Sequence, residues 1–185
     1  MIVDVVGIIE LTSIADGFLV LDTLVKKSPV TIMRAETINP GKYLIAITGD
    51  VASVEAAMDE GLETGGTGIH DHILLRNLDE KFFSAIHQCV VPQQWDALGF
   101  LETYSVVSAL EAADTAVKIA AVQVVEIAAG NETGGKAILK INGPVGDVTI
   151  AMEKIAAIAR EKGQLCRDVI IPGPHSDIRG FVCGN

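Results

Sequence analysis

Hydrophobic and polar positions follow the same order in both halves of the chain. A short apolar run, at residues 7–12 and again at 100–104, predicts a strand. Ser13 or Ser105 comes next and precedes a segment with helical periodicity, so a helix is expected after each serine. In the first helix we expect a mostly apolar stripe with charges outside it, made of Ala15, Phe18, Leu19, Asp22, Val25 and Lys26.

The rest of each half predicts a hairpin, a second helix and a last strand. The hairpins are expected at 30–38 with 43–48 and at 122–128 with 137–142, separated by glycine-rich turns. Second helices are expected at 51–63 and 145–161, and last strands at 73–75 and 169–171. The order βαββαβ predicts an α+β fold of ferredoxin-like type in each half, with an antiparallel sheet and its helices on one side.

The two halves also share identical residues at a fixed offset, which indicates a tandem duplication. Residues 7–30 align with 99–122, and eight of these 24 positions are identical: Gly7/Gly99, Glu10/Glu102, Ser13/Ser105, Asp22/Asp114, Thr23/Thr115, Val25/Val117, Lys26/Lys118 and Val30/Val122. After a two-residue insertion the identities continue as Gly41-Lys42/Gly135-Lys136, Gly49/Gly143, Val51/Val145, Val54/Val148 and Met58/Met152. We therefore expect domains at 1–88 and 97–185, with Pro92 and Gln93-Gln94 in a linker.

Composition and charge exclude several classes of partner. The net charge is −10 and the pI is about 4.7, so the chain lacks the basic face that nucleic acids or a membrane surface would require. Its start has no basic segment before the apolar residues, which predicts a cytosolic protein without a signal peptide. The cysteines Cys89, Cys166 and Cys183 are odd in number and have no CxxC spacing, so we expect free thiols and no disulfide framework.

Residues 130–136 match the G-x4-G-K pattern of a phosphate-binding loop, but two features argue against nucleotide binding. Ala137 replaces the hydroxyl residue that holds Mg²⁺, and the residues that follow alternate as in a strand instead of opening a helix. A nucleotide-binding enzyme remains an alternative that a helix after Lys136 would favour.

Other candidate groups are polar residues with a simpler structural explanation. His70 and His72 flank Asp71, and His87, Cys89 and His175 lie elsewhere, but the spacing is not that of a metal site. The repeated Glu10 and Glu102 are expected to accept hydrogen bonds from the backbone, lysine or serine instead of acting as catalytic acids. No catalytic, cofactor-binding or metal-binding residue is therefore expected, and the chain is not predicted to be an enzyme.

Four segments of the second half resemble the bacterial microcompartment shell domain. They are LGFLET at 98–103, ALEAADTAVK at 109–118, Gly134-Gly135-Lys136, and VIIPGPH at 169–175, and the first half repeats the pattern more loosely. The resemblance implies a structural protein whose tandem domains form a homotrimer that mimics a hexamer. Such trimers tile with other shell proteins into a cytoplasmic shell around metabolic enzymes. The unpermuted order implies the tandem class that makes one flat layer.

The resemblance also implies a central pore for small metabolites or cofactors. Its lining would come from the two hairpin loops: Ile38, Asn39 and Pro40, with Asn131, Glu132 and Thr133. In propanediol-utilisation tandem shell proteins a cysteine before Pro-Gly-Lys holds a [4Fe–4S] cluster on the threefold axis, and Asn39 stands at that place here, so we expect a polar pore without a cluster. Two alternatives stay open: Asn39 as a plain turn residue, and an electron carrier that uses Cys89, Cys166 or Cys183.

Two lysines resemble the residue that packs across neighbouring oligomers at the edge of a tile. They are Lys26 and Lys118, each near the expected end of a helix. The family's Pro-Arg-Pro-His segment reads Pro172-Gly173-Pro174-His175 here and lacks the arginine. The expected partners are thus further copies of this chain, other shell proteins and small metabolites.

Overall fold

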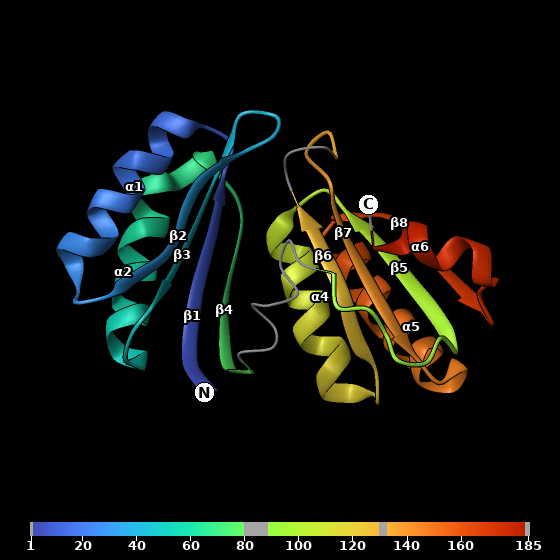
Figure 1. Cartoon of the computed structure of the whole chain (residues 1–185). Coiled ribbons are helices and arrows are strands. Elements are labelled where there is room, and N and C mark those ends of the chain that lie inside the picture. Colours follow the sequence, from blue (N-terminus) through green and yellow to red (C-terminus); the bar gives the residue numbers. More distant parts are fainter. Residues whose placement is uncertain (1, 80–88, 130–132, 184–185) are drawn as a thin grey trace. The chain divides into compact units, whose positions relative to one another are not determined.

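The computed structural model describes residues 2–79, 89–129 and 133–183, which form two compact units (Figure 1). Residues 2–79 and 133–135 belong to the first unit, and residues 89–129 and 136–183 to the second. The first contains β1 (Ile2–Leu11), α1 (Ile14–Lys27), β2 (Thr31–Ile38), β3 (Lys42–Thr48), α2 (Val51–Gly65), η1 (Gly66–Gly68) and β4 (Ile69–Asp79). The second contains β5 (Ala97–Thr103), α4 (Val106–Ile119), β6 (Gln123–Ala129), β7 (Ala137–Gly143), α5 (Val145–Glu161), β8 (Leu165–Pro172), η2 (Ser176–Ile178) and α6 (Arg179–Val182).

Each unit has one antiparallel sheet of four strands. The strand orders are β2-β3-β1-β4 and β6-β7-β5-β8, so the two sheets have the same topology. The helices of each unit pack against each other and against their sheet, and in the first unit Figure 1 shows α1 and α2 on the same side of it. The predicted tandem α+β fold is confirmed. Several strands are longer than predicted, because polar residues at their ends still pair with a neighbouring strand, as Asp71 does with Glu10.

A helix begins after Ser13 and after Ser105, as the sequence predicts, and the structure shows that each serine is the N-cap of its helix. The Ser13 hydroxyl oxygen accepts a hydrogen bond from the Asp16 amide at 3.3 Å, and that of Ser105 accepts one from the Ser108 amide at 3.1 Å. Each bond satisfies an amide that has no partner within the helix. The repeated serine is therefore a helix-start residue in both units.

A repeated glycine and a repeated methionine form one packing contact in each unit. A Cβ atom at Gly7 would lie 2.6 Å from Met58 Sδ, and one at Gly99 would lie 2.7 Å from Met152 Sδ. Both methionines belong to the helix that follows the hairpin and are buried. Any residue larger than glycine would displace the methionine. The glycine and the methionine are therefore repeated together because they form the same close contact in both units.

The apolar stripe predicted for α1 is wrong about which face enters the core. The helix buries Gly17, Val20 and Leu24, whereas Phe18 and Leu19 are more than half exposed. Gly17 decides this, because a Cβ there would overlap the ring of Tyr43, and only glycine lets the helix approach β3 so closely. A hydrophobic pattern does not count glycine as a core residue and therefore favours the other face.

The expectation of three free thiols is also wrong. Cys89 and Cys183 form a disulfide with a Cα–Cα distance of 5.2 Å, within the usual range, and Cys166 is free. Both bonded cysteines pack against a small buried cluster of Leu98, Val125 and Val182. They are separated by 94 positions, so only the fold brings them together.

Candidate functional site

The tip of the first hairpin is a tight, exposed turn. Ile38 is buried, Asn39 and Pro40 are exposed, and the Gly41 amide donates to the Ile38 carbonyl at 3.1 Å. Gly41 has φ +87°, a conformation that favours glycine. Of the first three predicted pore residues, two are thus accessible on the hairpin tip, and the third anchors the tip to the core.

Behind this tip the repeated lysine meets the repeated glutamate. Lys42 Nζ donates to Glu10 Oε1 at 2.8 Å, and Glu10 is completely buried between β3 and β4. His70 Nε2 lies 3.9 Å from the same oxygen. This confirms that Glu10 accepts a lysine hydrogen bond, as its repetition predicts, and the bond fixes the first residue of β3 to the neighbouring strand.

The second hairpin repeats this ion pair at a more exposed place. Lys136 Nζ donates to Glu102 Oε2 at 2.9 Å, which lowers the pKa of Glu102 although partial burial acts in the opposite direction. The same carboxylate raises the pKa of Lys136. Thr133 is half-buried and precedes Gly134 and Gly135, which both have positive φ. Asn131 and Glu132 lie outside the described residues.

The segment after Lys136 is a strand, so the phosphate-loop alternative fails. β7 begins at Ala137 and pairs with β5 and β6, so the loop leads into a strand and not into a helix N-terminus. Sequence reasoning missed one neighbour of this loop, the free Cys166, whose Sγ lies 3.5 Å from Glu102 Oε2. A hydrogen bond between the side chains of Cys166 and Tyr104 raises the pKa of Tyr104. The strand register places Cys166 at the position that His70 occupies in the first unit. Aligning the last strands of the two halves in the sequence could have identified this equivalence.

The two proposed edge lysines lie in the last turn of α1 and α4. Lys26 Nζ contacts Asp22 at 2.5 Å, and Lys118 Nζ contacts Asp114 at 2.7 Å, each four residues earlier on the helix. Both residues of this pair are identical in the two aligned halves of the chain. Both ammonium groups therefore occupy the same exposed place relative to their sheets.

Cysteine and histidine are not grouped as a metal site would require in the part of the chain that the structure describes. No group of three or more His, Cys, Asp or Glu side chains there could hold a metal ion. His87 lies outside the described residues, and His175 is exposed beside Asp177. The disulfide occupies two of the three thiols that the electron-carrier alternative would use.

The helices of the described residues include none long and apolar enough to span a membrane. What the repeated side chains do build is a pair of hairpin tips, each held at its base by a lysine-glutamate ion pair. This arrangement presents the two loops.

Comparisons with known proteins identify the fold and its duplication. The BMC domain model matches residues 5–77 and again 97–174. The shell protein PduT of Citrobacter freundii is 35% identical over 173 residues, covering 94% of each chain, and the shell protein PduA of the same organism is 39% identical over 91 residues, 48% of this chain and 94% of its own. A crystal structure of a microcompartment protein from Desulfitobacterium hafniense superimposes with a TM-score of 0.79 at 33% identity, covering 96% of this chain and 99% of that one. With two matches that together span most of its length, this chain belongs to the BMC-domain family of bacterial microcompartment shell proteins.

Proposed function

We propose that three copies of this tandem shell protein close into a ring of six domains with a pore at its centre. The protein is a structural component of a microcompartment shell and not an enzyme. We take its domains as residues 1–88 and 97–185. Two domains in each chain require three chains for a six-domain ring, and cyclic closure leaves no open end from which a filament could grow.

The observation that carries this proposal is a difference in exposure between the two equivalent helices. Phe18 on α1 is 59% exposed, whereas its counterpart Leu110 on α4 is 3% exposed. Ile14 is 36% exposed and its counterpart Val106 is 1% exposed. A face that is covered in one domain and open in its copy is the face expected to be covered when further copies assemble.

The edge strands β4 and β8 can be compared in the same way. Val169 on β8 is 39% exposed, and its counterpart on β4, Ile73, is half-buried. The exposed surfaces are thus α1 in the first domain and β8 in the second, which are different parts of the fold. We expect α1 of one copy to lie against β8 of the next, a head-to-tail contact that closes after three copies.

In such a ring the hairpin tips would line the pore. Asn39 and Pro40, anchored by the buried Ile38, would alternate around the axis with Asn131, Glu132 and Thr133. The exposed amide of Asn39 favours a polar opening for small metabolites or cofactors. The outer edge, with Lys26 and Lys118, would contact further tiles and other shell proteins.

Sedimentation velocity of the full chain tests this assembly. The wild-type protein is expected to sediment as a trimer at micromolar concentration. A variant with Phe18→Asp and Leu19→Asp should sediment as a folded monomer, because both side chains lie on the open face of α1. As the matched control, Ile150→Asp changes an equally exposed apolar residue of α5 and should leave the trimer intact.

Two results would contradict the proposal. A wild-type chain that stays monomeric at these concentrations rules out the ring. A trimer that survives both α1 substitutions, with an unchanged circular dichroism spectrum, removes α1 from the interface.

A further inference from the structure

The C-terminal segment of the second unit packs on its sheet and is joined to the linker by the disulfide. The segment contains η2 and α6, and Val182 of α6 packs with Leu98 and Val125 in the small buried cluster. Cys183 follows α6 directly and is bonded to Cys89 at the start of the linker. A helix of four residues is not stable on its own, so α6 depends on these contacts.

The first domain supplies an internal comparison for the surface under α6. Met33 in β2 is the counterpart of Val125 in β6, because each lies at the bulge where its strand pairs with the next strand of the hairpin. Met33 is 37% exposed, whereas Val125 is completely buried. Val125 would therefore become exposed if α6 left the sheet.

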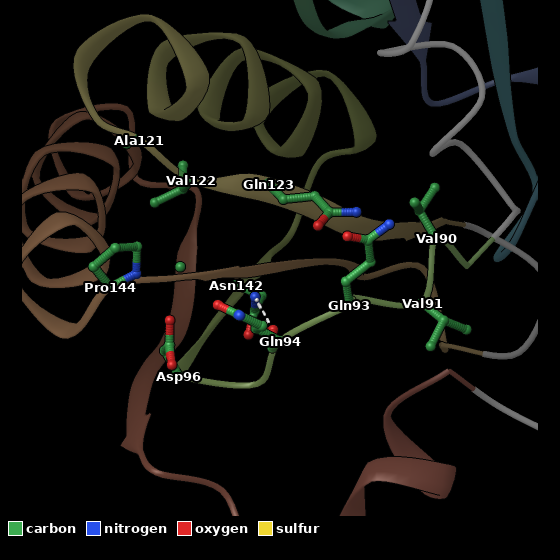
Figure 2. A pocket seen from close by; sticks show the side chains of 11 residues that line it. Val90, Val91, Gln93, Gln94, Asp96, Ala121, Val122, Gln123, Asn142 and Pro144 are labelled. Carbon is green, nitrogen blue, oxygen red and sulfur yellow. Dashed lines mark hydrogen bonds between the residues drawn. The ribbon is translucent and has the colours of Figure 1, made fainter.

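The linker end of the disulfide is held to the sheet by hydrogen bonds. The Val90 amide donates to the Val125 carbonyl at 2.7 Å. Asn142 Nδ2 donates to the Gln94 carbonyl at 2.9 Å, as Figure 2 shows. These bonds involve no sulfur, so Cys89 stays in place when the disulfide opens.

The C-terminal end is held by side chains of the linker and the sheet. Lys140 Nζ donates to the Val182 carbonyl and also to Glu126 Oε2. The Arg179 guanidinium lies over the Trp95 ring, 5.9 Å from its centroid. Lys140 keeps Glu126 as a partner when Val182 leaves, so the departure of α6 leaves no charge of this pair uncompensated. The sheet therefore stays folded when α6 detaches.

The disulfide belongs to a shell protein of the cytoplasm, and both of its cysteines are only half-buried. Cytoplasmic thiols are kept reduced, and the disulfides that form there are usually transient or redox-sensing. We propose that Cys89 and Cys183 form a redox latch, in which a dithiol reductant opens the bond and α6 detaches from the sheet. The latch thus controls whether the apolar surface around Leu98 and Val125 is covered.

The exchange at the latch balances with one dithiol for each chain. One thiolate of the reductant attacks a sulfur of the bond, releases the other cysteine and forms a mixed disulfide. The second thiol of the reductant then displaces the bound cysteine and closes a disulfide within the reductant. The two thiol protons of the reductant pass to Cys89 and Cys183. The oxidised dithiol reverses these steps and closes the latch.

Trp95 is the single tryptophan of the chain and reports on α6 through its contact with Arg179. The full wild-type chain is first oxidised with the cyclic disulfide of dithiothreitol and then treated with dithiothreitol without denaturant. Reduction should raise the acrylamide quenching constant of Trp95 about 2-fold, because the segment that lies over the ring detaches.

Limited digestion with trypsin measures the same opening at α6 itself. Cleavage after Arg179 should be about 10-fold faster in the reduced chain, because a detached segment fits a protease more readily than a packed helix. Cleavage after Arg167 is the internal control and should not change, because β8 stays paired with β5. All samples are reduced after digestion, so that the disulfide does not conceal a cleaved peptide.

Two variants assign the effect to the latch. Cys183→Ser cannot form the bond, so it should show the values of the reduced chain without dithiothreitol and should not respond to it. Cys166→Ser is the matched control, because it removes the free thiol and should respond as the wild type does. Circular dichroism of each sample shows whether the domains stay folded.

Four results would overturn the proposal. The first is an oxidised wild-type chain in which all three thiols still react. The second is a bond that dithiothreitol opens only in denaturant. The third is complete reduction with unchanged Trp95 quenching and unchanged cleavage after Arg179, which means that α6 stays bound without the bond. The fourth is a loss of circular dichroism signal on reduction, which means that the bond holds the whole domain. These comparisons use the wild-type chain and do not depend on whether Cys183→Ser folds.

Discussion

Lys42 and Glu10 form an ion pair inside the first domain, with 2.8 Å between Nζ and Oε1, and Lys136 and Glu102 form its copy at 2.9 Å in the second. The exposed fractions of the lysine and glutamate side chains are 14% and 0% in the first pair, but 40% and 35% in the second. The same chemistry thus occurs once in the interior and once near solvent. This makes each pair the control for the other.

Lys42→Met should destabilise the protein far more than Lys136→Met. The first change leaves the buried Glu10 carboxylate without its cation, which typically costs about 3 kcal/mol. The second leaves a carboxylate that water can solvate, and screening makes such a pair weak. Urea unfolding midpoints of the two variants measure the difference. Equal losses would mean that the burial of Glu10 does not strengthen its pair.

The second pair predicts a pH dependence. The pKa of Glu102 is lowered by Lys136, so its contribution to stability is present above the ordinary glutamate pKa and is lost as the pH falls through the lowered value. The pKa of Lys136 is raised, so its contribution is present below the ordinary lysine pKa and is lost as the pH rises through the raised value. The gap in urea midpoint between wild type and Glu102→Gln should therefore be larger at pH 7 than at pH 3. A gap independent of pH would contradict this.

The disulfide predicts how many thiols react. Protein purified without reductant and unfolded in denaturant should take one iodoacetamide label, on Cys166, and three labels after reduction. Cys183→Ser should expose Cys89 to labelling and lower the free energy of unfolding by roughly 2–5 kcal/mol, because it opens a long covalent loop. Cys166→Ser is the control and should leave the bond in place. Three labels before reduction would show that the bond does not form.

The proposed edge positions of Lys26 and Lys118 predict an effect on tiling without an effect on the trimer. A variant with Lys26→Asp and Lys118→Asp should remain trimeric but form fewer sheets in the electron microscope, because contacts between tiles tolerate a change of sign poorly. Lys154→Asp with Arg160→Asp changes the net charge equally on exposed positions of α5 and should tile normally. Normal sheets from both variants would remove Lys26 and Lys118 from the edge.

The proposed pore position of Asn39 predicts a gain of function. Threefold symmetry would bring three copies of residue 39 together, so Asn39→Cys should supply three thiolates. After anaerobic reconstitution this variant should contain iron and sulfide and absorb broadly in the visible range, while the wild type stays colourless. Thr31→Cys, at the other end of β2, is the matched control and should bind no cluster. A trimeric Asn39→Cys variant without iron would place residue 39 away from the axis.

Much of the fold could be predicted because each signal is local or repeated. Ser13 and Ser105 begin helices by bonding to amides three residues away. Aligning the two halves shows Gly7, Met58, Glu10 and Lys42 as four separate repeated residues. In the structure they form two contacts, Gly7 with Met58 and Glu10 with Lys42. Both members of each pair recur because a contact, and not a single residue, was duplicated.

Contacts between residues distant in the chain were less predictable, and in the candidate site Cys166 beside Glu102 is such a contact. The core face of α1 is set by the approach of Gly17 to Tyr43, which no apolar count along the helix contains. Cys89 reaches Cys183 only because both pack on the same buried cluster.

By itself, then, the sequence determined the duplication, the order of strands and helices, and the family, because periodicity, caps and repeated spacing are written along the chain. Only the tertiary structure decided which helix face is buried and which thiols are joined. The physical reason is that burial and hydrogen bonding depend on which distant groups share a space, and one-dimensional spacing does not contain that information.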